Sequence, residues 1–172
     1  MHQSIINFTN IQNSIKENQE KTNNKNNIKI IAVSKTFEIS HINPLIDYGH
    51  TDFGENKVQE AIEKWSDIKL KNQNLSLHLV GKLQSNKTKL ALKIFDYIHS
   101  LDSEKLANKI SEEQKKIDKK PKLFIQVNIG NEDQKSGVSP NKLKTFYQYC
   151  LDKDLDVIGT MCLPPISEDP EK

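Results

Sequence analysis

Short apolar runs alternate with longer mixed segments over most of this sequence of 172 residues. The apolar runs lie at 28–33, 52–53, 75–80, 97–99, 123–127 and 155–161. Several of the segments between them repeat apolar residues every three or four positions, as amphipathic helices do. Strands that alternate with helices in this way predict βαβ units, and therefore an α/β fold with a parallel sheet.

Four segments have the clearest helical periodicity, at 4–18, 58–68, 106–117 and 143–150. The last is preceded by Ser139, a favourable N-cap residue, and by Pro140, which suits the first position of a helix. The runs at 28–33 and 123–127 are almost uniformly apolar, which predicts strands covered on both faces.

Six strands agree with two architectures. One is an open, doubly wound sheet. The other is an eight-unit TIM-type barrel that lacks its last units, since a complete barrel needs at least ~200 residues. Residues 161–165 resemble a strand that runs into a loop with no helix after it, so a barrel truncated at its C-terminus is one expectation.

Composition narrows the classes of function. Charged residues make up 28% of the chain, yet the net charge is only +2 and aromatic residues are 6%, which argues against nucleic-acid binding. All 25 basic residues are Lys, so the bidentate anion grip of Arg is absent from this sequence. No apolar run approaches the roughly 20 residues of a membrane span, and no secretory signal opens the chain.

The two cysteines, Cys150 and Cys162, are too far apart for a CxxC motif and are expected to be small buried residues in a reducing compartment. The sequence therefore predicts a cytoplasmic protein. No His, Cys or Asp grouping has the spacing of metal ligands, so no metal site is expected.

Candidate chemistry gathers where the expected strands end, which is where parallel α/β folds bind ligands. Lys35 follows the first apolar run with only Ser34 between them, so we expect it to be partly desolvated, with a lowered pKa and a nucleophilic amine. Such an amine forms Schiff bases with aldehydes. The structural alternative is a lysine that extends from the strand end into solvent.

Two other positions also have structural alternatives. Asn56, with Gln59 three residues later, approximates a capping box for the helix that follows. The isolated His78 within an apolar run is more typical of a hydrogen-bonded core residue than of a ligand.

Six segments at strand ends together resemble the pyridoxal 5′-phosphate (PLP) homeostasis proteins, the YggS/PROSC family. They are AVSKT (32–36), FGENKVQE (53–60), HLVGKLQSNK (78–87), IHSLD (98–102), VNIGNEDQKSG (127–137) and GTMCLPP (159–165). The resemblance implies a type III PLP fold, a TIM-type barrel like the N-terminal domain of alanine racemases. About six of the eight strands would be present, in a single PLP-binding domain over 1–172.

The same resemblance implies roles for four residues. Lys35 would hold PLP as an internal aldimine, and Asn56 would lie beside the cofactor. Lys135 would face the mouth of the site, and Met161 would lie near the pyridine ring. No residue is assigned a catalytic role.

The chain departs from the family pattern at its end. Nothing matches the final segments that supply the phosphate cradle and an arginine near the ring nitrogen. We therefore expect residues 1–172 alone to bind PLP poorly and to associate, because an open barrel has two unpaired edges.

The leading hypothesis is a non-catalytic PLP carrier that passes the cofactor to apo forms of PLP-dependent enzymes. A PLP-dependent amino-acid racemase is the alternative, and a Schiff-base aldolase that uses Lys35 without a cofactor is a third. Weak racemase-like activity is compatible with the first hypothesis. The sequence indicates no oligomeric state.

Overall fold

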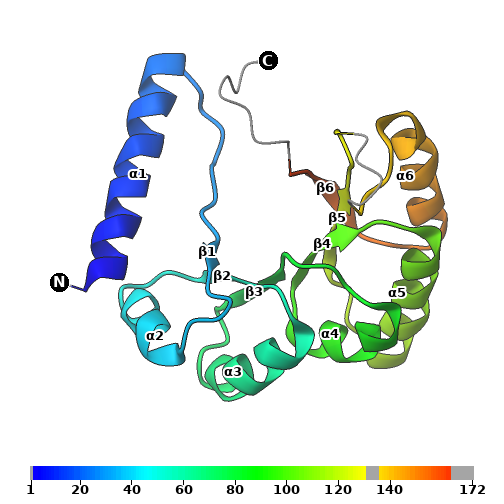
Figure 1. The fold of residues 1–172 in the computed structure, drawn as a ribbon, viewed down its shortest axis with the longest axis horizontal. Helices are drawn as coiled ribbons and strands as arrows, with labels where there is room; N and C mark the ends of the chain where they lie inside the picture. Colours follow the sequence, from blue (N-terminus) through cyan, green and yellow to red (C-terminus); the bar gives the residue numbers. More distant parts are fainter. Residues whose placement is uncertain (1, 131–135, 164–172) are drawn as a thin grey trace.

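The computed structural model describes residues 2–130 and 136–163. Its centre is a parallel sheet whose strands are in the order β1-β2-β3-β4-β5-β6, so each strand pairs with its neighbours in sequence (Figure 1). The strands are β1 (Ala32–Val33), β2 (Asp52–Glu55), β3 (Ser76–Leu79), β4 (Tyr97–Leu101), β5 (Lys122–Gln126) and β6 (Val157–Met161). The prediction of an α/β fold with six parallel strands is confirmed.

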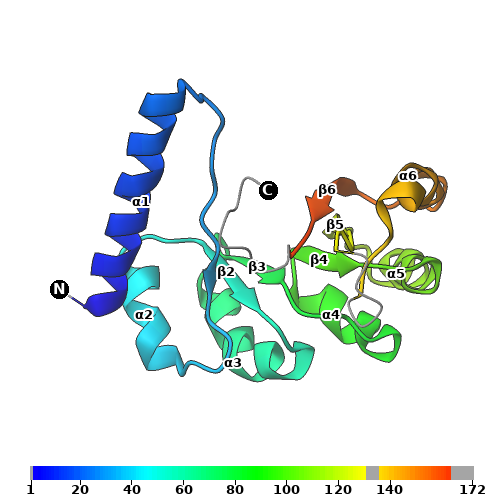
Figure 2. The same cartoon turned by 45° about the horizontal axis from the view of Figure 1, so that its top comes forward.

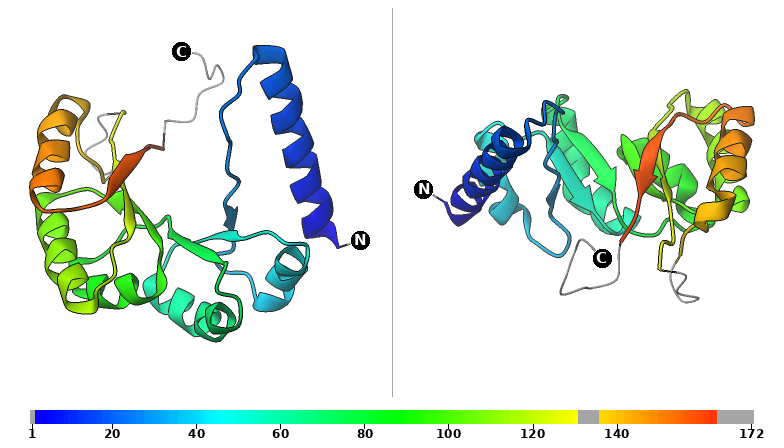
Figure 3. Two further views of the ribbon diagram at one scale, coloured as in Figure 1. Left: turned by 180° about the vertical axis from the view of Figure 1, so that it is seen from behind. Right: turned by 90° about the horizontal axis from the view of Figure 1, so that it is seen from above.

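Helices connect successive strands and cover the outer face of the curved sheet (Figure 3). They are α2 (Ile39–Asp47), α3 (Val58–Lys71), α4 (Thr88–Ile94), α5 (Glu104–Ile117) and α6 (Leu143–Asp152), with short 3-10 helices η1 (Ser85–Lys87) and η2 (Pro140–Lys142) before α4 and α6. The opening helix α1 (Gln3–Thr22) lies beside α2, away from the middle of the sheet (Figure 2).

The sheet is not a closed barrel. Within the described residues, β1 and β6 each pair with a single neighbour and form the two edges. This arrangement agrees with an incomplete TIM-type barrel, in which each strand is followed by a helix on the outside.

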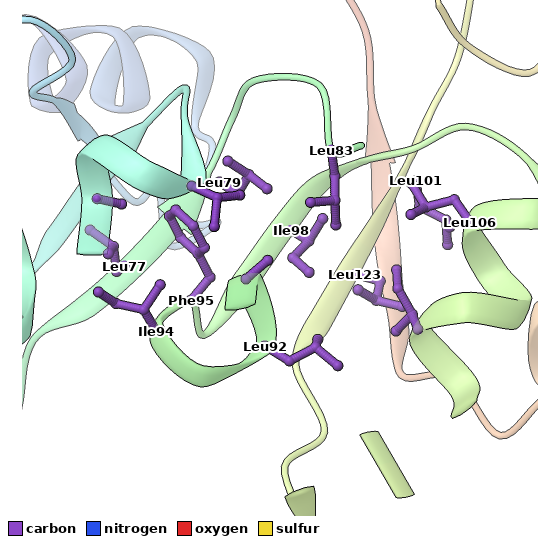
Figure 4. Packing of buried hydrophobic residues seen from close by; sticks show 14 of the residues in the cluster. Leu77, Leu79, Leu83, Leu92, Ile94, Phe95, Ile98, Leu101, Leu106 and Leu123 are labelled. Carbon is purple, nitrogen blue, oxygen red and sulfur yellow. The ribbon is translucent and has the colours of Figure 1, made fainter. Parts of the chain in front are cut away.

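The core lies between the sheet and its helices. Because side chains alternate along a strand, every second residue of β3, β4 and β5 points towards α3, α4 and α5. These strand residues include Leu77, Leu79, Ile98 and Leu123, all at most 1% exposed, and they pack among helix residues such as Leu106 (Figure 4). The periodic patterns in the sequence reflect this buried layer.

The expectation of a long first strand covered on both faces is wrong. Strand β1 has two residues, and the side chains of Ile28 and Val33 are 46% exposed. The reason is position: β1 is an edge strand, so an apolar run there has one strand neighbour among the described residues and one uncovered face.

Helix boundaries follow the sequence pattern with small differences. Helix α1 extends to Thr22, beyond the predicted end. Ser139 and Pro140 do begin a helical segment, but this segment is the 3-10 helix η2, and the Ser139 hydroxyl donates to the Asn141 side chain at 2.7 Å instead of capping backbone. None of the described helices is long and apolar enough to cross a membrane.

Candidate functional site at the carboxyl ends of the strands

Lys35 lies in the turn between β1 and α2, at the carboxyl end of the first strand. Its side chain is exposed, so the predicted partial desolvation is not found. The reason is again the edge position of β1, which leaves the amine without an apolar wall on one side. Lys35 is thus available to a ligand at the end of the sheet where parallel α/β folds bind them.

The turn that carries Lys35 is held by hydrogen bonds. The Ser34 amide donates to the Gly54 carbonyl at 2.8 Å, and the Ser34 hydroxyl donates to Glu55 Oε1 at 2.8 Å. On the other side of Lys35, the Thr36 amide donates to Glu60 Oε1 at 2.7 Å. This bond and the nearby ammonium group of Lys64 hold the pKa of Glu60 below its ordinary value.

Asn56 directly follows β2, the strand paired with β1, and its side chain is partly buried. The alternative prediction, that Asn56 and Gln59 form a capping box for α3, is wrong. Lys57 occupies the N-cap position of α3, and the Gln59 side chain donates to Glu63 at 3.2 Å. The capping pattern failed because the helix begins one residue later than the pattern requires.

Gly81 fixes the backbone of Asn56. A Cβ atom added to Gly81 would lie 2.3 Å from the Asn56 carbonyl oxygen and 2.8 Å from its Cα, closer than real side chains come. Only a glycine after β3 therefore allows the β2 and β3 loops to approach this closely. The two loops are locked together beside the Lys35 turn.

Met161 ends β6, at the opposite edge of the sheet from Lys35, and is partly buried. Its carbonyl accepts the Val127 amide at 2.8 Å. Neighbouring Cys162 is exposed, whereas Cys150 is buried, so the expectation of two buried cysteines is wrong for Cys162.

Lys135 lies outside the described residues. The described residues that flank it return to the sheet, since the Asn128 amide donates to the Val138 carbonyl at 3.0 Å. Lys82 Nζ, from the loop after β3, donates to the Ser136 hydroxyl at 2.8 Å. These contacts tie the loop after β5 to the loop after β3 at the carboxyl ends of the strands.

A polar line crosses the inner face of the sheet, opposite the helices. Asp52 Oδ1 lies 2.8 Å from Lys29 Nζ and 3.1 Å from His78 Nε2, and His78 Nδ1 lies 3.0 Å from His99 Nε2. The His78 ring stacks on Tyr97 with centroids 4.2 Å apart. His78 is therefore a hydrogen-bonded core residue, as expected, but it has a histidine partner that the sequence did not indicate.

The protonation states in this line follow from burial. Burial, together with the neighbouring His78, lowers the pKa of His99 to about 4. Burial also lowers the pKa of His78, against the opposing effect of its hydrogen bond to Asp52. Burial acts to raise the pKa of Asp52, but hydrogen bonds from Lys29, His78 and Thr51 outweigh it and lower that pKa. At pH 7 both imidazoles are neutral and Asp52 is ionised.

The structure thus places Lys35 and Asn56 just after the ends of the paired strands β1 and β2, and it places Met161 on the far edge of the same sheet. Sequence reasoning missed the role of Glu60, which accepts the Thr36 amide beside Lys35. The only sequence signal for Glu60 was its location in a segment that follows a strand end. The glycine at position 81, in a loop after a strand end, did indicate a close approach of the backbone, and the structure places that approach at Asn56.

Comparison with known proteins gives a consistent set of relatives. The family model of the alanine racemase N-terminal domain matches residues 6–172. The pyridoxal phosphate homeostasis protein of Haemophilus influenzae is 40% identical over 146 residues, which cover 84% of this chain and 59% of that protein. The protein of the same name from Pasteurella multocida is 37% identical over 161 residues, covering 93% of this chain and 68% of its own. The chain therefore spans about three fifths to two thirds of the length of these two relatives.

Solved structures show the same similarity. PipY of Synechococcus elongatus, solved without PLP, has a TM-score of 0.76 at 32% identity and covers 89% of this chain and 72% of its own. With PLP bound, PipY has a TM-score of 0.73 at 33% identity, covering 88% and 71%. An alanine racemase of Clostridium difficile, at 18% identity and a TM-score of 0.62 over 87% of this chain and 39% of that one, shares the fold.

Proposed function

This chain belongs to the family of the alanine racemase N-terminal domain, and on that premise we propose that it binds pyridoxal 5′-phosphate through Lys35 and serves in the homeostasis of that cofactor. In this role it would hold the reactive aldehyde and pass it to apo forms of PLP-dependent enzymes. The names of the Haemophilus and Pasteurella relatives and the PLP-bound structure of PipY support the proposal.

The observation that carries the proposal is the placement of Lys35. Its exposed amine stands at the carboxyl end of β1, on a turn braced from both sides, next to the strand end that carries Asn56. Ligands of parallel α/β folds bind at this end of the sheet.

The residues present fit the cofactor at its aldehyde end. When bound, PLP supplies an aldehyde that condenses reversibly with a primary amine and releases water. Lys35 would provide that amine, and Asn56 would orient the ring from the neighbouring strand. We place Met161 near the ring from β6 and Lys135 at the mouth of the site. Anion contacts to the phosphate would come from Lys side chains and backbone amides, because the sequence contains no Arg.

A carrier role agrees with the groups at the site better than turnover does. Racemisation needs proton donors on both faces of the bound substrate. Among the described residues around the Lys35 turn, the hydrogen-bonded groups Ser34, Glu55 and Glu60 all brace backbone or one another. These groups can hold a lysine in place, which is what storage of the cofactor requires.

We also propose a location, a domain organisation and partners for the protein. We propose a cytoplasmic location, a single PLP-binding domain over 1–172, and apo-enzymes as the protein partners. Nucleic acid is not among the proposed ligands, because the net charge of +2 leaves little electrostatic attraction.

The test begins with absorbance spectra of the 172-residue chain in excess PLP. We expect a visible band for the wild type and for Lys57→Ala, which removes another exposed lysine, and loss of the band in Lys35→Ala. The loaded wild type should then activate a PLP-dependent enzyme stripped of its cofactor. An unchanged spectrum in Lys35→Ala would refute the assignment of the cofactor to this residue.

Two further outcomes would replace the proposal. Interconversion of single amino-acid enantiomers by the loaded chain at the rate of an enzyme would favour a racemase. A borohydride-trapped carbonyl substrate on Lys35 without any PLP band at any concentration would favour a Schiff-base aldolase.

A further inference from the structure

We propose that Glu60 and Lys64 of α3 are positioning residues for Lys35, because they clamp the peptide groups on either side of it. The effect of this clamp on PLP binding rests on the proposed function, that is, on PLP binding at Lys35. Neither residue would touch the cofactor. Their effect would pass through the backbone of the turn from β1 to α2.

The clamp consists of two side chains one helical turn apart. Before Lys35, the Ser34 carbonyl accepts a hydrogen bond from Lys64 Nζ at 2.9 Å. After Lys35, the Thr36 amide donates to Glu60 Oε1 at 2.7 Å. Glu60 and Lys64 also pair with each other at 3.1 Å. One helix face therefore holds both neighbours of Lys35.

The clamp rests on a buried carboxylate. Glu55, fully buried at the end of β2, accepts hydrogen bonds at Oε1 from Lys64 Nζ at 2.9 Å, the Ser34 hydroxyl at 2.8 Å and Trp65 Nε1 at 3.0 Å. A buried charge held this way stays only where its partners stay, since separation would leave it unpaired. The position of Lys64 is thus fixed by the core beneath the sheet.

The turn needs such a clamp because its backbone is strained. Thr36 has φ of 65° in the left-handed region, which is rare for a β-branched residue. Strained conformations persist where surrounding contacts enforce them, and they concentrate at functional sites. The bond from Thr36 N–H to Glu60 is a contact of that kind.

Packing alone does not hold the turn. Phe37, the large apolar residue after Thr36, is 55% exposed, and Val33 before Ser34 is 46% exposed. The neighbouring apolar side chains therefore anchor this segment weakly. Without the contacts to α3, the backbone at Lys35 would sample more conformations, and its amine would no longer have a fixed position.

The chain offers a matched pair of variants on one helix. Glu60→Ala removes the acceptor of the Thr36 amide, whereas Glu63→Ala removes an exposed glutamate that accepts a hydrogen bond from the Gln59 side chain on the same helix. In the protein without cofactor, we expect Glu60→Ala to speed hydrogen exchange of the Thr36 amide by roughly tenfold and Glu63→Ala to leave it unchanged.

The second readout is the rate at which PLP is captured on Lys35 by borohydride, relative to capture on Lys57. We expect Glu60→Ala to lower this ratio about fivefold, Glu63→Ala to leave it unchanged, and Glu60→Gln to restore it, because the amide oxygen still accepts from Thr36. Recovery by the neutral residue distinguishes positioning from a loss of local charge.

Lys64→Met provides an independent test, matched by Lys69→Met. Lys69 also joins a carboxylate, Asp96, to a carbonyl, that of Ile94, but at a distance in the fold from Lys35. Both variants should lower stability, and only Lys64→Met should lower the capture ratio at Lys35.

Equal capture ratios in the two members of each pair would overturn the clamp. If the wild type captures no PLP on Lys35, the proposed function fails instead, and the exchange of the Thr36 amide still decides whether the clamp exists. If Lys64→Met does not fold, the test rests on the Glu60 and Glu63 variants. Glu60 is partly exposed, and its substitution leaves the contact between Lys64 and Glu55 intact.

Discussion

The middle of the sheet and its edges are held together differently. In the middle, Leu79 of β3 and Ile98 of β4 are 0% exposed and pack between the sheet and its helices. At the edges, Val33 of β1 and Ile158 of β6 are each 46% exposed. The fold is stabilised by the apolar middle, whereas Lys35 belongs to an edge that packs weakly.

The comparison shows how a site can be precise without being part of the core. The turn that carries Lys35 is fixed by Ser34, Glu55, Glu60 and Lys64 through hydrogen bonds and ion pairs. Such contacts are directional, so they set the position of an amine while leaving it open to a ligand. Apolar packing would have buried the amine.

The largest expected effect separates the two regions directly. Ile98→Ala should lower the free energy of unfolding by about 2–5 kcal/mol, because it opens a cavity in the packed layer. Ile158→Ala should cost less than about 1 kcal/mol, because solvent already reaches that side chain. Urea unfolding of both variants measures the difference, and equal losses would contradict the contrast between middle and edge.

The next effect is the dependence of stability on pH. The pKa of His99 is about 4 in the folded protein and about 6.5 in the unfolded chain. The unfolded state binds more protons between these values, so stability should fall as the pH drops from about 6.5 through about 4, by roughly 3 kcal/mol in all. His99→Gln, which does not titrate, should reduce this dependence, and an identical pH profile in the variant would show that His99 is not its source.

A smaller effect is expected at the contact between two loops. Gly81→Ala should destabilise the protein by about 1–3 kcal/mol, because the new methyl group meets the backbone of Asn56. It should also lower capture of PLP on Lys35. Gly49→Ala is the control: its φ of 97° strains an alanine, but nothing lies within 4 Å of the added atom. Equal capture in the two variants would remove the role assigned to Gly81.

The smallest expected effect concerns the two edge strands of the sheet. Strands β1 and β6 each lack a second neighbour among the described residues, and unpaired edges favour association. We expect the 172-residue chain to associate as concentration rises in sedimentation experiments and to lose PLP readily on dialysis. A monodisperse preparation that keeps its PLP through dialysis would contradict both expectations.

Much of the fold could be predicted because the elements buried in the middle of the sheet have periodic apolar residues in their sequences. The helical face that contains Ala61 and Trp65 and the apolar run that contains Leu77 and Leu79 describe the same packed layer from its two sides. At 28–33 the same kind of run gave the wrong strand length and the wrong environment for Lys35. An apolar run does not indicate whether the strand will pair on both sides or lie at an edge of the sheet.

The site was predicted at its strand ends but not in its contacts. The location of Lys35 and Asn56 at neighbouring strand ends could be predicted, because parallel strands end on the same side. Their roles towards PLP rest on the family resemblance and stay predictions. The bond from Thr36 to Glu60 and the bond from His78 to His99 join residues more than twenty positions apart. The first depends on where α3 packs against the turn after β1, and the second on the register between β3 and β4. Residue types alone specify neither.

The preference of PLP for Lys35 is tested most sharply by measuring the adduct on every lysine in one experiment. The 172-residue chain is incubated with excess PLP, reduced with borohydride, digested, and analysed by mass spectrometry for the share of adduct on each of its 25 lysines. We expect the peptide with Lys35 to carry most of the adduct, and this share to fall in Glu60→Ala but not in Glu63→Ala. An adduct spread evenly over the exposed lysines, with no preference for position 35, would contradict this expectation.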